Sequence, residues 1–79
     1  MTVNVLFFAS LREATNTREL SLSLELPLST RALADKLEQD YSELSLKGSL
    51  CAINEQYANP DDLIHEGDTV AFFPPVSGG

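Results

Sequence analysis

The segment from Glu19 to Leu26 alternates strictly between apolar and polar residues. Leucine occupies positions 20, 22, 24 and 26, and Ser21, Ser23 and Glu25 stand between them. A period of two predicts a β-strand with one face packed and the other in water, which is typical of antiparallel sheets. Because the leucine face must be buried against another element, this segment requires a sheet that is covered on one side.

The N-terminal segment predicts a second strand with two unequal faces. One face is apolar and comprises Val3, Val5, Phe7 and Ala9; the other is mixed and comprises Asn4, Leu6, Phe8 and Ser10. Between the two strands, Arg12–Thr17 is expected to form a hairpin loop. Asn16 is its best candidate for a positive φ angle, because asparagine tolerates the left-handed region.

A helix is predicted after Pro27, which ends the second strand. Ser29 is the expected N-cap, and Leu33, Leu37 and Tyr41 recur every four residues as one apolar stripe. This stripe supplies the cover that the leucine face requires.

Two further strands, Leu50–Ile53 and Thr69–Phe73, complete the predicted order, with a short strand between them. In an α+β domain of this size the main helix must cover one face of a mixed sheet, and the first and last strands lie side by side in its middle. This is the ubiquitin-like β-grasp, and we expect residues 1–79 to form one such domain.

The other face of this sheet is left uncovered. Alternation in the last strand directs Phe72 toward the helix and Phe73 away from it, so Phe73 and Phe8 should be neighbours on the open face, together with Leu6. An exposed pair of aromatic rings is costly for a soluble monomer. The pattern therefore predicts a protein partner.

Charge narrows the class of partner. Twelve acidic and five basic residues give a net charge of −7, which disfavours nucleic acid and anionic membranes and favours a basic protein surface. The apolar run Val5–Ala9 is far too short to span a membrane, so a cytoplasmic location is expected. The single cysteine, Cys51, forms no intrachain disulfide.

The sequence ends in two glycines, Gly78 and Gly79. Such an end presents an uncrowded carboxylate on a backbone thin enough for a narrow channel. With a pKa of about 3.5 the carboxylate is ionised and unreactive at neutral pH, so it needs activation, for example as an acyl-adenylate. The pair alone fits a plain glycine tail equally well.

The context of the pair is more specific. The run Val70–Gly79 closely resembles the C-terminal signature of the small, sulfur-carrying subunit of molybdopterin synthase. Further matches are Val5–Ala9 followed by Leu11-Arg12-Glu13, Ala52–Asn54, and Glu66–Asp68. The first hairpin departs from the family, with residues 14–16 reading Ala-Thr-Asn where glycine is frequent.

The resemblance implies a non-catalytic carrier subunit. Gly79 would be adenylated with ATP by a ubiquitin-activating-like adenylyltransferase and converted to a thiocarboxylate with sulfur from a donor protein. It would then deliver sulfur to cyclic pyranopterin monophosphate in the large subunit, in a heterotetramer, while Gly78 keeps the passage open. The family's pattern implies no bound cofactor or metal.

Partner-binding positions follow from the resemblance and from the expected open face. They are Phe8, Tyr57, Phe73, Pro74, Pro75, Val76, Ser77 and Arg12. Residues 74–79 are expected to form a flexible tail that the prolines bias toward extension, with a reach of about 20 Å. For Arg12, a local surface pair with Glu13 is an equally good explanation.

Alternatives remain at this point. A thiamine-pathway sulfur carrier shares the fold and the diglycine, although the paired phenylalanines and prolines argue against it. A ubiquitin-like protein modifier shares the chemistry up to the adenylate. Cys51 is expected to be a buried structural thiol, His65 a solvated surface residue, and Asp61-Asp62 a solvated turn.

Overall fold

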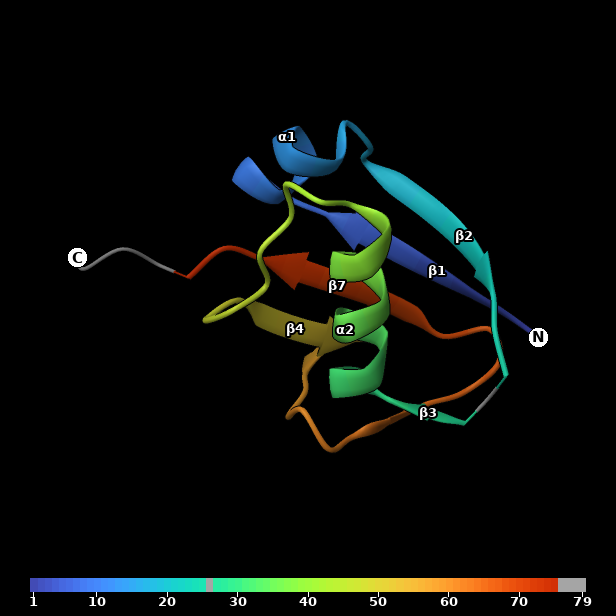
Figure 1. Cartoon of the computed structure of the whole chain (residues 1–79). Helices are drawn as coiled ribbons and strands as arrows, with labels where there is room; N and C mark the ends of the chain where they lie inside the picture. Colours follow the sequence, from blue (N-terminus) through green and yellow to red (C-terminus); the bar gives the residue numbers. More distant parts are fainter. Residues whose placement is uncertain (26, 76–79) are drawn as a thin grey trace.

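A computed structural model describes residues 1–25 and 27–75. A twisted five-stranded sheet is crossed on one face by the main helix (Figure 1). In chain order the elements are β1 (Thr2–Phe7), α1 (Ser10–Thr15), β2 (Glu19–Ser23), β3 (Leu28–Ser29), α2 (Thr30–Asp40), β4 (Leu50–Ile53), β5 (Gln56–Tyr57), β6 (Leu63–Ile64) and β7 (Thr69–Phe73).

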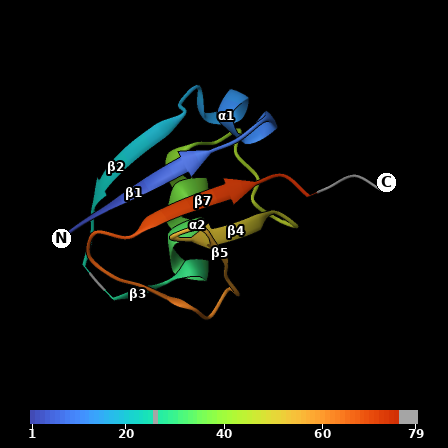
Figure 2. The same ribbon diagram turned by 180° about the vertical axis from the view of Figure 1, so that it is seen from behind.

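The strand order across the large sheet is β2-β1-β7-β4-β5. The first and last strands, β1 and β7, pair in parallel at its centre, and the outer pairs are antiparallel. Figure 2 shows the sheet from its open side, with α2 behind it. The mixed sheet and the central pairing of its first and last strands are as the sequence predicts, and the arrangement is a β-grasp. A second sheet of β3 and β6 was not foreseen.

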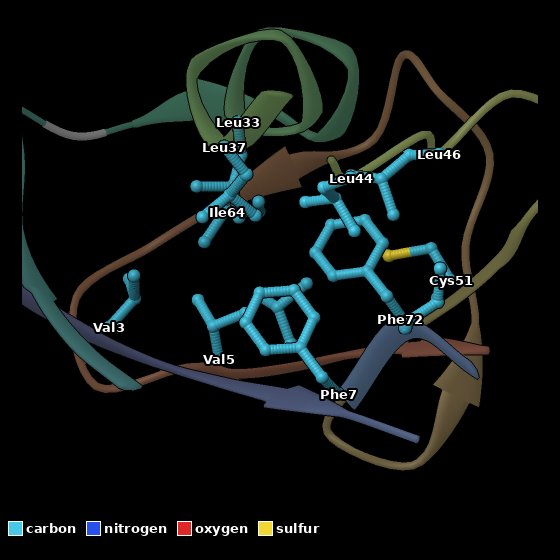
Figure 3. Packing of buried hydrophobic residues seen from close by; sticks show 12 residues of the cluster. Val3, Val5, Phe7, Leu33, Leu37, Leu44, Leu46, Cys51, Ile64 and Phe72 are labelled. Carbon is cyan, nitrogen blue, oxygen red and sulfur yellow. The ribbon is translucent and has the colours of Figure 1, made fainter. Parts of the chain in front are cut away.

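The core lies between α2 and the covered face of the sheet (Figure 3). Alternation in β1 buries Val3, Val5 and Phe7, which are at most 1% exposed. The Phe7 ring stacks on Phe72 of β7 at a centroid distance of 6.3 Å and meets Tyr41 edge to face at the same distance. The helix contributes its predicted stripe, so two periodicities meet in one cluster.

The helix begins where the sequence places its cap. The Ser29 hydroxyl accepts a hydrogen bond from the Ala32 amide at 3.1 Å, as an N-cap residue should. The Thr30 amide and hydroxyl both donate to the Asp62 carbonyl at 2.9 Å. The loop before β6 is thereby fastened to the first turn of α2.

The connection between β1 and β2 differs from the expected hairpin loop. Residues Ser10–Thr15 form a short helix, α1, anchored by the buried Leu11 and by a bond from the Thr15 hydroxyl to the Leu11 carbonyl at 3.1 Å. Asn16 caps it in the left-handed region at φ 55°, the conformation predicted for this residue. The spacing of Leu11, Ala14 and Thr15 is the helical signal that the loop interpretation missed.

Ala9 also departs from its prediction. It leaves the strand, is exposed, and adopts φ 52° and ψ −127°, a region that glycine tolerates far better than alanine. Its carbonyl accepts from the amides of Arg12 and Glu13. The start of α1 therefore holds this strained backbone in place.

The second strand is shorter than its sequence pattern. It ends at Ser23, although the Leu24 amide still donates to the Met1 carbonyl at 2.8 Å. Leu20, Leu22 and Leu24 pack partly buried against the core. The predicted face is correct for these three residues, and Leu26 lies outside the described part of the chain.

Candidate functional site

The open face of the sheet carries two apolar rows near the C-terminal end of β7. The register of the strands places Phe73 opposite Leu50, and Ala71 between Leu6 and Ala52. Ala52 in turn lies opposite Tyr57. We call these residues the open-face patch: Leu6, Phe8, Leu50, Ala52, Tyr57, Ala71 and Phe73.

The centre of the patch is the predicted aromatic pair. The rings of Phe8 and Phe73 stack with centroids 4.9 Å apart and planes inclined by only 12°. Phe8 is nevertheless 42% exposed and Phe73 is half-buried. The pair is a preformed aromatic platform that another molecule can still cover.

The open face becomes polar away from the tail. Asn4 lies between Ser21 and Thr69 in the register, and the Ser21 hydroxyl lies 3.3 Å from the Asn4 side-chain oxygen. The apolar surface is thus concentrated where the chain leaves β7, rather than spread over the sheet.

Tyr57 occupies the far side of the patch from Phe8. Its side chain is 79% exposed, which is the largest value among the exposed large apolar residues. It belongs to β5, a strand of two residues at the sheet edge. The structure therefore places Tyr57 on the same face as the aromatic pair, and its contact with a partner stays a prediction.

The tail begins directly beside the aromatic pair. Pro74 is half-buried and Pro75 is exposed. The predicted roles of Val76, Ser77, Gly78 and Gly79 lie outside the described residues. Because Phe73 precedes Pro74, a partner that covers the patch meets the chain where the tail starts.

Arg12 lies on α1 and is exposed. Among the described residues no ion pair joins it to Glu13; the pairs found are Arg31–Asp61 at 3.4 Å and Lys36–Asp40 at 3.5 Å, both exposed. The structure thus gives no support to the local surface pair, and partner contact by Arg12 stays a prediction.

The remaining titratable candidates lie either in the core or on the exposed surface. Cys51 is 9% exposed and points into the core; burial, with a further contribution from the Asp62 charge, raises its pKa from 9.0 to about 11. Such a thiol is not a nucleophile at neutral pH. His65 is exposed, as are Asp61 and Asp62, and within residues 1–25 and 27–75 no cluster of three potential ligands could hold a metal ion.

A polar network fastens the turns at the opposite end of the sheet from the tail. The Asp68 carboxylate accepts from the His65 amide at 2.8 Å and from the Asn54 side-chain amide at 2.9 Å. These bonds, the backbone one foremost, lower the pKa of Asp68 below its ordinary 3.8. The network stabilises the approach to β7, and no part of it lies at the tail.

Sequence reasoning placed Ala71 on the open face but missed Leu50 and Ala52 as members of the patch. Their positions depend on the register between β4 and β7, which one sequence does not define. Leu50 gave one signal, since alternation through Leu50–Ile53 puts it on the face opposite Cys51.

None of the described helices is long and apolar enough to cross a membrane.

The sequence of the chain is similar to those of known proteins. The ThiS family model matches residues 5–79. The chain belongs to the ThiS family. Its curated relatives include a molybdopterin synthase sulfur carrier subunit of Escherichia coli, 36% identical over 98% of this chain and 99% of the relative. Another, from Drosophila sechellia, is 38% identical over 98% of this chain and 90% of the relative. The predicted kinship with these small subunits is confirmed.

Solved structures share the fold of this ThiS-family protein. Small archaeal modifier protein 1 from Haloferax volcanii superposes with a TM-score of 0.83 at 22% identity, over the full length of both chains. A chain from the Helicobacter pylori complex of subunits 1 and 2 of molybdopterin-converting factor gives 0.70 at 23% identity, also over both full lengths. At these identities the comparison confirms the β-grasp fold.

Proposed function

We propose that this ThiS-family protein is the sulfur carrier subunit of molybdopterin synthase. The proposal rests mainly on the similarity of the chain, along nearly its whole length, to curated subunits of that name, together with its terminal diglycine. The open-face patch supports the proposal, because a carrier must dock on a partner while its tail reaches into that partner's site. In this proposal the chain is a non-catalytic carrier, and the chemistry is assigned to Gly79.

The proposed cycle starts at the Gly79 carboxylate. One carboxylate oxygen attacks the α-phosphate of ATP, releasing pyrophosphate and leaving an acyl-adenylate. A sulfide equivalent from a donor protein then displaces AMP and forms the thiocarboxylate. The thiocarboxylate sulfur then attacks a carbon of the pterin precursor, cyclic pyranopterin monophosphate, as a C–O bond at that carbon breaks. Water cleaves the resulting acyl–sulfur bond, which leaves the sulfur on the pterin and restores the carboxylate. The chain itself contributes the carrier end and the docking surface.

The proposed partners are an adenylyltransferase, a sulfur donor protein and the large synthase subunit. The patch fits the last of these, since Phe8 and Phe73 form a flat apolar platform at the root of the tail. Burying such aromatic anchors is the usual source of interface affinity. A cytoplasmic place of action is part of the proposal.

Removal of Gly79 tests the proposal. We expect the shortened chain to fold like the full chain and to lose sulfur transfer completely in a reconstituted molybdopterin assay. Intact mass of the full chain purified from its host should show sulfur replacing one oxygen. Synthesis of molybdopterin by the shortened chain would overturn the proposal, as would conjugates to other proteins without any thiocarboxylate.

A further inference from the structure

A groove of about 560 Å³ runs between α2 and the edge of the sheet formed by β4 and β5. It shares only Leu50 and Tyr57 with the open-face patch. Its apolar lining comes from both layers and includes Ala34, Leu46, Cys51, Pro60 and Phe72. A space of this size is in the range of ligand and peptide sites and would accept more than one side chain.

The groove is continuous with the patch at one margin. Leu50 and Tyr57 belong to the patch by register and also line the groove. They are 39% and 79% exposed. The strand between the two surfaces, β5, is only two residues long, so a chain that covers the patch can pass over this edge into the groove.

Charged groups at the rim differ in what they already bind. Glu38 accepts from the Leu46 amide at 2.6 Å, and Arg31 lies 3.4 Å from Asp61. Asp35 and Lys47, which also line the groove, form no ion pair within the described part of the chain. Their charges are therefore available to form ion pairs with a segment that binds in the groove.

We propose that a segment of the large subunit which covers the open-face patch continues over the β5 edge and fills this groove with apolar side chains. A carboxylate of that segment meets Lys47, and a basic group meets Asp35. The inference rests on the proposed function, since it names a second contact with the same partner. In this arrangement the partner contacts the sheet on both sides of its β5 edge, at the open-face patch and in the groove.

Cys51 provides a built-in probe. It is the only cysteine in the chain, and it lines the groove. Figure 3 shows its sulfur beside the ring of Phe72, on the covered side of the sheet. A partner that covers only the patch lies on the opposite face and leaves this thiol as accessible as before.

The experiment measures alkylation of Cys51 by iodoacetamide at pH 9, where about 1% of a thiol with a pKa of about 11 is ionised. The rate is measured with and without saturating large subunit from the same host. We expect the complex to slow alkylation at least tenfold. The control is the double variant Cys51→Ala with Leu22→Cys, which places a partly buried thiol on β2 at the other sheet edge. Its rate should change much less, because the groove contact does not reach β2. A general stabilisation of the fold by binding would instead slow both thiols equally.

The outcomes separate the two proposals. A complex that forms while Cys51 reacts at its free rate would overturn the groove contact and leave the carrier function standing. Equal protection of both thiols would overturn it too, since tightening of the whole fold would explain the result. If no complex forms with the wild-type chain, the proposed function itself fails.

A second measurement uses the helix side of the groove. Ala34→Phe fills part of it, and Ala32→Phe is the control, because Ala32 is also half-buried on α2 but does not line the groove. With both variants shown to fold by circular dichroism, we expect Ala34→Phe to weaken binding at least tenfold and Ala32→Phe to leave it within twofold. Equal affinities would contradict the groove contact.

Discussion

Phenylalanine occurs on both faces of the central sheet, and it is buried on one face and more exposed on the other. Phe7 and Phe8 are consecutive, as are Phe72 and Phe73, and each pair splits across the sheet. Phe7 and Phe72 are 1% and 2% exposed beneath α2, whereas Phe8 is 42% exposed on the open face. Both splits produce a stacked pair, at 6.3 Å inside and 4.9 Å outside.

The two faces of the sheet differ because α2 covers only one of them. The inner pair is buried by α2 of the same chain, so its apolar area contributes to folding. The outer pair has no such cover in the chain, so under the proposed function its area contributes mostly to association. Substitutions on the two faces should therefore separate stability from binding, even at neighbouring positions.

The largest expected effect is on the covered face. Phe72→Ala removes a ring from the packed core and should lower the free energy of unfolding by about 3–5 kcal/mol. Urea denaturation followed by circular dichroism measures this loss. A cost below that of Phe73→Ala would break the comparison between the faces.

The covered face also gives a pH effect, through Cys51. Burial raises the pKa of its thiol from 9.0 to about 11, so the folded chain holds this proton more tightly than the unfolded chain. Stability is therefore complete below pH 9 and falls as pH rises toward 11, by about 2 to 3 kcal/mol. The difference in unfolding free energy between wild type and Cys51→Ala isolates this effect from other groups. A difference that stays constant from pH 8 to 11 would contradict it.

On the open face the expected loss is in binding. Phe73→Ala and Phe8→Ala should each weaken association with the large subunit by about 2 kcal/mol, as truncation of an aromatic anchor does. Their own stability should fall by about 1 kcal/mol, the value of one exposed aromatic pair. Calorimetric titration measures the affinity, and Ser21→Ala on the polar part of the face is the matched control. Wild-type affinity in both phenylalanine variants would show that the patch is not the interface.

The smallest effect concerns the residue that follows the outer ring. Ala9 holds a positive φ at the end of β1, and Ala9→Gly should stabilise the chain by about 1 kcal/mol by relieving that strain. The thermal midpoint measures the gain. A lower midpoint would show that alanine is unstrained here and that glycine only adds flexibility to the unfolded chain.

Sequence reasoning predicted the covered face better than its surroundings. The leucines of β2, the apolar side of β1 and the stripe of α2 follow from periodicity alone, because each pattern lasts long enough to exclude its alternative. The short elements did not follow. α1 has six residues, and β3 and β6 have two each, so their patterns are too brief to outweigh tertiary contacts.

The candidate site divides in the same way. Phe8 and Phe73 were predicted as neighbours because the two central strands have strong alternation and their pairing follows from the fold. Leu50 and Ala52 depend on the register of a neighbouring strand, and the groove depends on how far α2 stands from the sheet edge. Neither quantity is written in a local pattern.

The parallel pairing of β1 with β7 has a consequence for synthesis of the chain. Register partners such as Asn4 and Thr69 come from opposite ends of the sequence, so the contact order is high and folding is expected to be slow for so small a domain. On the ribosome the sheet lacks its central strand until translation has passed residue 73. A chain released early within β7 would lack both the core strand and the carrier end, and proteases that clear unfolded chains would remove it. Folding thus requires that translation has passed β7, the strand that directly precedes the tail.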